Sequence, residues 1–138
     1  MTKVLVVEDD YFNRQLVFEI LTAQGFMVNK ATDGLDAIRM TEDELYDFIL
    51  MDINLPGIDG IKTTRIIKSK PEYKDVPVVA LTAYAMKGDR ERILASGLDD
   101  YISKPIDLSD FIRLMGEYSL SGKKSNVANR LILYRLLN

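Results

Sequence analysis

The 138-residue sequence contains no cysteine, no histidine and no tryptophan, and only four prolines. The missing cysteines and histidines exclude disulfides, thiolate nucleophiles, Cys/His zinc sites and Ser-His-Asp triads. Any chemistry must therefore use carboxylates, hydroxyls, lysine or a hard metal ion. No apolar run approaches the roughly 20 residues that a membrane span needs, and residues 1–10 lack the pattern of a signal peptide. We therefore expect a cytoplasmic protein without a membrane partner.

Length and composition are typical of one soluble globular domain. Hydrophobic residues make up 47% of the chain and charged residues 28%, and a chain of this length buries enough surface to fold without a metal or a disulfide. All 21 acidic residues lie at or before Glu117, against 14 basic residues there, so residues 1–117 carry a net charge of −7. The remaining residues carry +4. An acidic body of this kind argues against direct nucleic-acid binding.

Short apolar runs alternate with longer amphipathic stretches along residues 3–117. The apolar runs predict five β-strands, and the spacing between and after them predicts five helices. The predicted strands are Lys3–Val7, Phe26–Ala31, Asp47–Met51, Val76–Leu81 and Asp100–Ser103. The predicted helices are Tyr11–Gln24, Asp33–Asp43, Asp59–Ser69, Lys87–Ser96 and Asp107–Glu117. This alternation indicates an α/β fold with a doubly wound, five-stranded parallel sheet between two layers of helices.

Carboxylates follow two of the predicted strands. Glu8, Asp9 and Asp10 come directly after the first strand, and Asp52 comes after the third. Because ligands of such sheets bind at the carboxyl ends of the strands, we expect these acids to converge there. Like charges at short range destabilise a fold unless a cation or a proton lies among them, and oxygen ligands suit Mg²⁺. An isolated acidic triplet is more often a solvated loop or a helix start, but Asp52 on a second strand favours the metal site.

Two more predicted strands end in residues that suit phosphoryl chemistry. Thr82 follows the fourth strand, and Lys104 follows the fifth, directly before Pro105. Each has an ordinary alternative, which is a helix cap for the threonine and a solvated charge for the lysine. Carboxylates, a hydroxyl and an ammonium around a hard metal provide a nucleophile, a charge-neutralising ion and donors for phosphoryl oxygens. This set of residues predicts phosphoryl transfer to a carboxylate.

The motifs at these strand ends together resemble a known family. They are Val-Glu-Asp-Asp (7–10), Leu-Met-Asp-Ile-Asn-Leu-Pro-Gly-Ile-Asp-Gly (50–60), Ala-Leu-Thr-Ala (80–83) and Asp-Tyr-Ile-Ser-Lys-Pro (100–105). They are similar to the receiver domain of two-component response regulators. The resemblance covers residues 2–118 and implies a flavodoxin-like sheet with strand order 2-1-3-4-5. On this basis residues 1–118 are the receiver domain and residues 119–138 a short C-terminal tail.

The resemblance also implies roles for individual residues around the metal. Asp52 would be the phosphoacceptor. Asp9 and Asp10 would bind Mg²⁺ together with it, and the backbone carbonyl of Asn54 would be a further ligand. Lys104 would pair with the phosphoryl group and would precede a cis peptide bond.

A conformational switch is implied at two further positions. Thr82 would move toward the phosphoryl group, and Tyr101 would turn inward in response. This movement would remodel the surface formed by Lys87–Ser96, Asp100–Ser103 and Asp107–Glu117, where a downstream protein would bind. The ordinary alternative for Tyr101 is a half-buried strand tyrosine with a hydrogen-bonded hydroxyl.

The function implied is that of a signalling receiver that takes a phosphoryl group onto Asp52 from a histidine kinase or a histidine phosphotransfer protein. It would catalyse only its own phosphorylation and dephosphorylation, and so would not be an enzyme acting on a separate substrate. Residues 83–89 resemble receivers of single-domain regulators and hybrid kinases in phosphorelays. The partner would supply the histidine that this chain lacks and dock near Tyr11–Leu21.

Other functional classes fit the sequence less well. A metal-dependent phosphohydrolase with an aspartyl nucleophile would need an acid two residues after the nucleophile, where Asn54 stands. A flavodoxin-like cofactor binder would need a Ser/Thr/Gly-rich loop after the first strand, where residues 8–10 are acidic. A phosphorylation-independent binding module is a further alternative.

The C-terminal tail lies outside the alternating pattern. A Ser/Gly/Lys/Asn stretch at Ser119–Asn126 is followed by the apolar segment Val127–Leu137. Such a segment is not expected to remain exposed. We expect it to pack on its own body as an added helix or strand. The alternative is a dimerising or domain-swapped element whose positive charge meets the acidic body of a neighbour.

Overall fold

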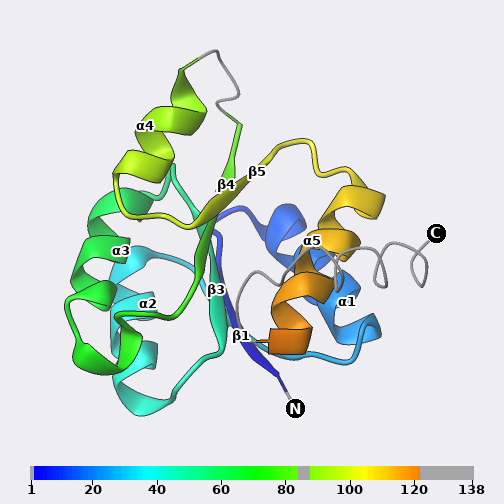
Figure 1. Cartoon of the computed structure of the whole chain (residues 1–138), viewed down its shortest axis with the longest axis horizontal. Helices are drawn as coiled ribbons and strands as arrows, with labels where there is room; N and C mark the ends of the chain where they lie inside the picture. Colours follow the sequence, from blue (N-terminus) through cyan, green and yellow to red (C-terminus); the bar gives the residue numbers. More distant parts are fainter. Residues whose placement is uncertain (1, 84–87, 122–138) are drawn as a thin grey trace.

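Five parallel strands form the centre of the molecule, and helices lie on both sides of them (Figure 1). The computed structural model describes residues 2–83 and 88–121. The strands are β1 Lys3–Val7, β2 Met27–Ala31, β3 Phe48–Asp52, β4 Val78–Thr82 and β5 Asp100–Ser103. The helices are α1 Tyr11–Ala23, α2 Gly34–Asp43, α3 Gly60–Lys68, the short 3-10 helix η1 Pro71–Tyr73, α4 Asp89–Ala95 and α5 Leu108–Ser121. The sheet order is β2-β1-β3-β4-β5, which confirms the predicted fold class and strand order.

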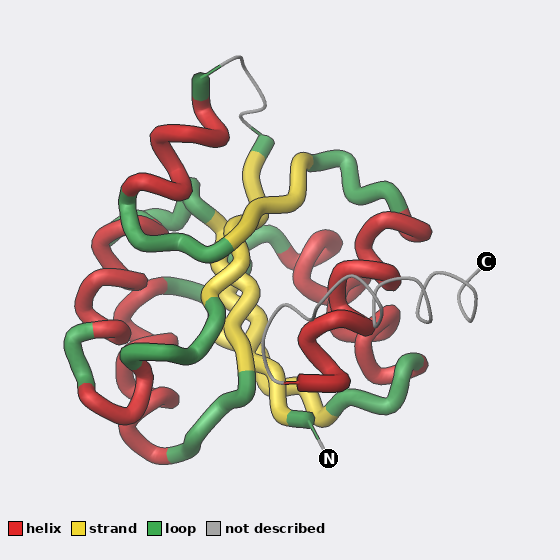
Figure 2. The backbone as a smooth tube through the Cα atoms, viewed as in Figure 1, coloured by secondary structure: helices red, strands yellow, loops and turns green. Residues whose placement is uncertain are grey.

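Helices lie on both faces of the sheet (Figure 2). The sheet separates two apolar cores. Val4 and Val6 of β1 pack with residues of α1 and α5 on one face. Leu5 and Val7 pack with residues of α2, α3 and α4 on the other. Side chains alternate between the two faces of a strand, so a strand buried on both faces needs an unbroken apolar run. The central strands β3 and β4 are buried at every position.

The central strands extend one residue further toward the carboxyl edge than predicted. β3 ends at Asp52 and β4 at Thr82, because Asp52 pairs with Leu81 and Thr82 pairs with Ser103 in the parallel ladders. Polar side chains at these positions gave no sign of this pairing in the sequence. The consequence is that the backbone of both residues is held by the sheet rather than by a loop.

Aspartates begin the first three helices. The carboxylates of Asp10, Asp33 and Asp59 accept hydrogen bonds from the backbone N–H groups three residues later, each at 2.8 Å. They are therefore N-caps, which satisfy amide groups that the helix itself leaves unpaired. α5 continues to Ser121, beyond its predicted end. Within the described ranges, no helix is long and apolar enough to cross a membrane.

The start of α3 lies directly against the end of β3. A Cβ atom at Gly60 would lie 2.2 Å from the carbonyl oxygen of Asp52, which is shorter than any tolerable contact. The Gly60 N–H donates to the carbonyl of Ile53 at 3.0 Å. Glycine therefore allows α3 to support the segment that carries Asp52.

Candidate functional site

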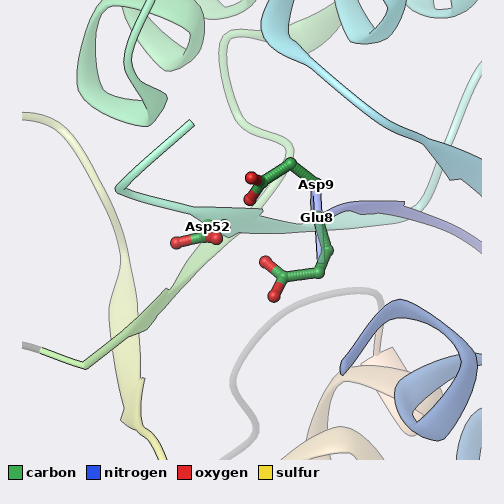
Figure 3. Close-up of side chains that lie close together, drawn as sticks. All are labelled: Glu8, Asp9 and Asp52. Atoms are coloured by element: carbon green, nitrogen blue, oxygen red, sulfur yellow. The ribbon is translucent and has the colours of Figure 1, made fainter. Parts of the chain in front are cut away.

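Three carboxylates converge at the carboxyl edge of the sheet (Figure 3). Glu8 and Asp9 follow β1, Asp52 ends β3, and one oxygen of each lies within 4.8 Å of the others. Glu8 is fully buried and Asp52 is 4% exposed, whereas Asp9 is exposed. The neighbouring positions of β1 and β3 in the sheet bring these residues together, as the sequence predicted for this edge.

Lys104 holds the two buried carboxylates. Its Nζ lies 2.7 Å from Oε1 of Glu8 and 3.3 Å from Oδ2 of Asp52. The backbone N–H of Lys104 donates to the carbonyl of Thr82 at 2.7 Å, which extends the β4–β5 pairing beyond β5. The peptide bond between Lys104 and Pro105 is cis, as the family resemblance implied. The ammonium thus lies between the acids of two other strands.

The close carboxylates shift one another's proton affinity. Burial and the neighbouring Asp52 raise the pKa of Glu8 to about 8, against the opposing effect of Lys104. Burial would also raise the pKa of Asp52, but Glu8, the Asn54 N–H and Lys104 together lower it. The two carboxylates outweigh burial at Lys104 and raise its pKa. Without a metal, Glu8 therefore binds a proton more tightly and Asp52 less tightly than a solvated carboxylate does, and the two carboxylates titrate as a pair.

The donor set of this cluster fits Mg²⁺. Oε2 of Glu8 is buried and has no hydrogen-bond partner among the residues that the structure describes. Buried polar atoms are ordinarily paired, so this oxygen is suited to a ligand that would enter beside Asp9. The available donors are all oxygens, which Mg²⁺ prefers.

The structure does not bring Asp10 into the cluster. Its carboxylate accepts a hydrogen bond from the Asn13 N–H at 2.8 Å and so caps α1. In the structure Asp10 therefore has the helix-start position that the sequence also offered for these acids. Asn54 lies beside the site, where its backbone N–H donates to Oδ1 of Asp52 at 3.0 Å.

Glu8 has no individual role among the site residues that the sequence predicts. The strand period of two indicates its burial, because Val4, Val6 and Glu8 are spaced two residues apart and so fall on the same side of the strand. An apolar strand face that continues into an acid predicts a buried carboxylate. Its partner, Lys104, lies 96 residues away in the chain. No local sequence pattern therefore indicates that the two residues pair.

The two predicted switch residues lie on neighbouring strands. Thr82 is buried at the end of β4, and Tyr101 is half-buried on β5, opposite Ala80. The guanidinium of Arg90, in α4, lies 5.8 Å from the centre of the Tyr101 ring. Tyr101 therefore connects β5 with α4, and Thr82 contacts the backbone of Lys104.

Comparison with known proteins identifies the arrangement. The family model described as "Response regulator receiver domain" matches residues 4–115. The chain belongs to this family. The polar-differentiation response regulator DivK of Brucella ovis is 41% identical to it over 119 residues, which cover 86% of this chain and 97% of that protein. The protein is thus a receiver domain of a response regulator in two-component signalling, as the motifs indicated.

Solved receiver structures are similar over most of the chain. The receiver domain of sensor histidine kinase PA1611 from Pseudomonas aeruginosa PAO1, with a magnesium ion in its active-site cleft, has a TM-score of 0.80 and 38% identity over 87% of this chain and 98% of that one. A second similar chain comes from the co-crystal structure of the Saccharomyces cerevisiae histidine phosphotransfer protein Ypd1 with the receiver domain of Ssk1. It has a TM-score of 0.76 and 26% identity, and the match covers 86% of this chain and 89% of that one.

The raised pKa of Glu8 predicts a pH dependence of the metal-free receiver. Its pKa of about 8 in the folded state lies above the ordinary 4.5, so the folded state binds this proton more tightly than the unfolded state does. The resulting stabilisation is complete below pH 4.5 and is lost as the pH rises to about 8. The lowered pKa of Asp52 acts below its ordinary 3.8, outside this window.

Urea unfolding in chelator, at several pH values, measures this effect. Relative to Glu8→Gln, which stays neutral, the wild type should lose up to about 1.4 kcal/mol of unfolding free energy per pH unit within the window. The surface variant Glu44→Gln is the control and should follow the wild type. Parallel pH profiles for the wild type and Glu8→Gln would contradict the assignment.

Proposed function

We propose that the receiver accepts a phosphoryl group on Asp52 from a phosphohistidine. The observation that carries the proposal is the position of the Asp52 carboxylate, which is almost fully buried, ionised and in contact with Lys104 at the edge where Glu8 and Asp9 converge. A carboxylate that is already ionised needs no general base to act as a nucleophile.

The chemistry is a transfer between two nucleophiles. An oxygen of Asp52 forms a bond to phosphorus while the bond from phosphorus to the histidine nitrogen breaks, and its electron pair leaves with the imidazole. Lys104 would neutralise the charge of the phosphoryl oxygens, and Thr82 would donate a hydrogen bond to one of them. Attack of water on phosphorus later restores the carboxylate and releases inorganic phosphate. The receiver would therefore catalyse only its own phosphorylation and dephosphorylation.

Glu8, Asp9, Asp52 and the carbonyl of Asn54 would hold Mg²⁺ at this site. When bound, the ion supplies positive charge to the oxygens of the transferring group. The cation-poor balance of the metal-free cluster, with two buried acids and one ammonium, supports this role.

The phosphodonor would dock on the exposed face of α1. Phe12 is 79% exposed, and Tyr11 and Leu16 are exposed beside it, which is unusual for side chains of this size. The chain has no histidine of its own, so the phosphohistidine must come from a partner, such as a histidine kinase or a histidine phosphotransfer protein. The similarity to a chain of the Ypd1–Ssk1 complex supports a partner of this class.

Thr82 and Tyr101 would transmit the conformational change from the phosphorylated site to the protein surface. A cleft of about 430 Å³ between α4, β5 and α5 is lined by Arg90, Asp100, Tyr101 and residues of α5. An inward turn of Tyr101 would break its contact with Arg90 and change the shape of this cleft. We propose this surface for a downstream protein, in a regulator that works in the cytoplasm with residues 1–118 as its receiver domain.

The phosphoacceptor assignment is tested by intact mass after incubation with a small phosphodonor. The wild type should gain one phosphoryl group in Mg²⁺ and none in chelator, whereas Asp52→Asn should gain none in either. Asp59→Asn, which changes only the cap of α3, is the control and should behave as the wild type. A wild type without adduct in Mg²⁺ would indicate a binding module that works without phosphorylation.

The ligand assignment separates two adjacent acids. Asp9→Asn should weaken Mg²⁺ binding by at least about tenfold, because it removes a charged ligand oxygen. Asp10→Asn should leave binding nearly unchanged, since asparagine caps a helix as well as aspartate does. Calorimetric titration with Mg²⁺ measures both. Equal losses in the two variants would refute the exclusion of Asp10 from the site.

The switch assignment predicts a loss of coupling without a loss of phosphorylation. Thr82→Ala should still gain the phosphoryl group but should no longer transmit the change to β5, since the hydroxyl is missing. The amide resonances of Tyr101 and Ile102 should then stay unshifted on phosphorylation. Thr82→Ser keeps the hydroxyl and should restore the shifts. Wild-type shifts in Thr82→Ala would contradict the role of this residue.

A further inference from the structure

Helices α1 and α5 lie on the side of the sheet opposite α2 and α3 (Figure 1). An apolar groove lies between them. Its volume is about 340 Å³, and its apolar walls are Leu16 and Ile20 of α1 with Leu108 and Ile112 of α5. Leu16 is 47% exposed and Leu108 is 54% exposed. Two exposed leucines on one groove forgo the free energy that their burial would provide, so the groove is suited to an apolar occupant.

The chain itself supplies a segment of matching chemistry. Residues 122–138 follow α5 and lie outside the described residues. Within them, residues 127–137 have Val, Leu, Ile or Tyr at seven of eleven positions and contain no glycine or proline. Leucine and arginine, which dominate this segment, are good helix formers. We infer that residues 127–137 pack as a helix into the α1–α5 groove of their own chain.

The reach of this segment fits the position of the groove. α5 ends at Ser121, and residues 122–126 include Gly122, which allows the chain to reverse. A helix over residues 127–137 would extend about 16 Å. The distance along α5 from Ser121 back to Ile112 is about 14 Å at the helical rise. A helix antiparallel to α5 would therefore cover the groove.

Charge favours the same contact. Lys123, Lys124, Arg130 and Arg135 give residues 122–138 a net charge of +4, and the rest of the chain carries −7. Glu19 of α1 lines the groove and adds a carboxylate to it. A neighbouring chain carries the same charges, but attachment through a five-residue turn gives the groove of the same chain a much higher effective concentration.

The location has a consequence for signalling that rests on the proposed function. Leu16 belongs both to the groove and to the exposed face of α1 that includes Phe12. A helix in the groove would therefore compete with a phosphodonor protein on α1. Small phosphodonors do not need this face, so the site at Asp52 would remain open to them.

The absence of cysteine allows a direct test in the full chain. A nitroxide on Asn138→Cys should broaden the amide resonances of Leu108 and Ile112 in the same molecule, and leave those of α2 sharp. Mixing isotope-labelled protein without nitroxide with unlabelled protein that carries it detects contacts between molecules. If the Leu108 and Ile112 resonances broaden only in this mixture, the segment in the groove comes from a second copy, and the inference is overturned. The absence of any broadening would overturn it as well.

Matched surface variants identify the groove as the binding site. Leu16→Ser combined with Leu108→Ser should abolish the broadening, because both apolar walls lose their leucine. Leu35→Ser, at a 69% exposed position of α2, should leave it unchanged. Broadening that survives the double variant would overturn the inference. These measurements use no phosphoryl chemistry, so a failure of the Asp52 assignment would not change their outcome.

Discussion

Two buried carboxylates need a cation between them, and Lys104 provides it. Glu8 and Asp52 come from two adjacent strands, while Lys104 follows β5 and contacts both acids at 2.7 and 3.3 Å. Removing such charges from water costs several kcal/mol per ion unless each is paired. The cluster therefore depends on the sheet, which brings the ends of β1, β3 and β5 to one edge. Fold and site depend on each other through this contact.

The same contact makes the metal-free site responsive. One ammonium does not neutralise two acids, so the pKa of Glu8 is raised and one of its oxygens stays unpaired within the described structure. A bound cation or a new phosphoryl group would directly change the balance of charge among Glu8, Asp52 and Lys104. Because Lys104 is also hydrogen-bonded through its backbone to Thr82, the change occurs next to the residues that connect to β5 and α4.

Helix α1 shows why an amphipathic pattern does not determine which side packs. The sequence places Phe12, Leu16 and Ile20 on one face, with Val17 and Leu21 beside them. Only Val17 and Leu21 are fully buried, whereas Phe12 and Leu16 are exposed. Five apolar residues cover a wider arc than one sheet can bury, and the angle of α1 against the sheet decides which of them reach the core. The remaining apolar side chains are left for contacts outside the core.

The sequence alone determined the fold class and the edge of the sheet that carries the site, because strand and helix periods are local patterns. Family motifs are local as well, and they indicated the candidate site residues Asp9, Asp52, Thr82, Tyr101 and Lys104. Only the tertiary structure distinguishes the positions of Glu8 and Asp10. Both acids adjoin Asp9, but one is buried against Lys104 and the other caps α1. Proton affinity and ligand geometry depend on distances across strands, and the contact between Glu8 and Lys104 spans 96 residues of chain.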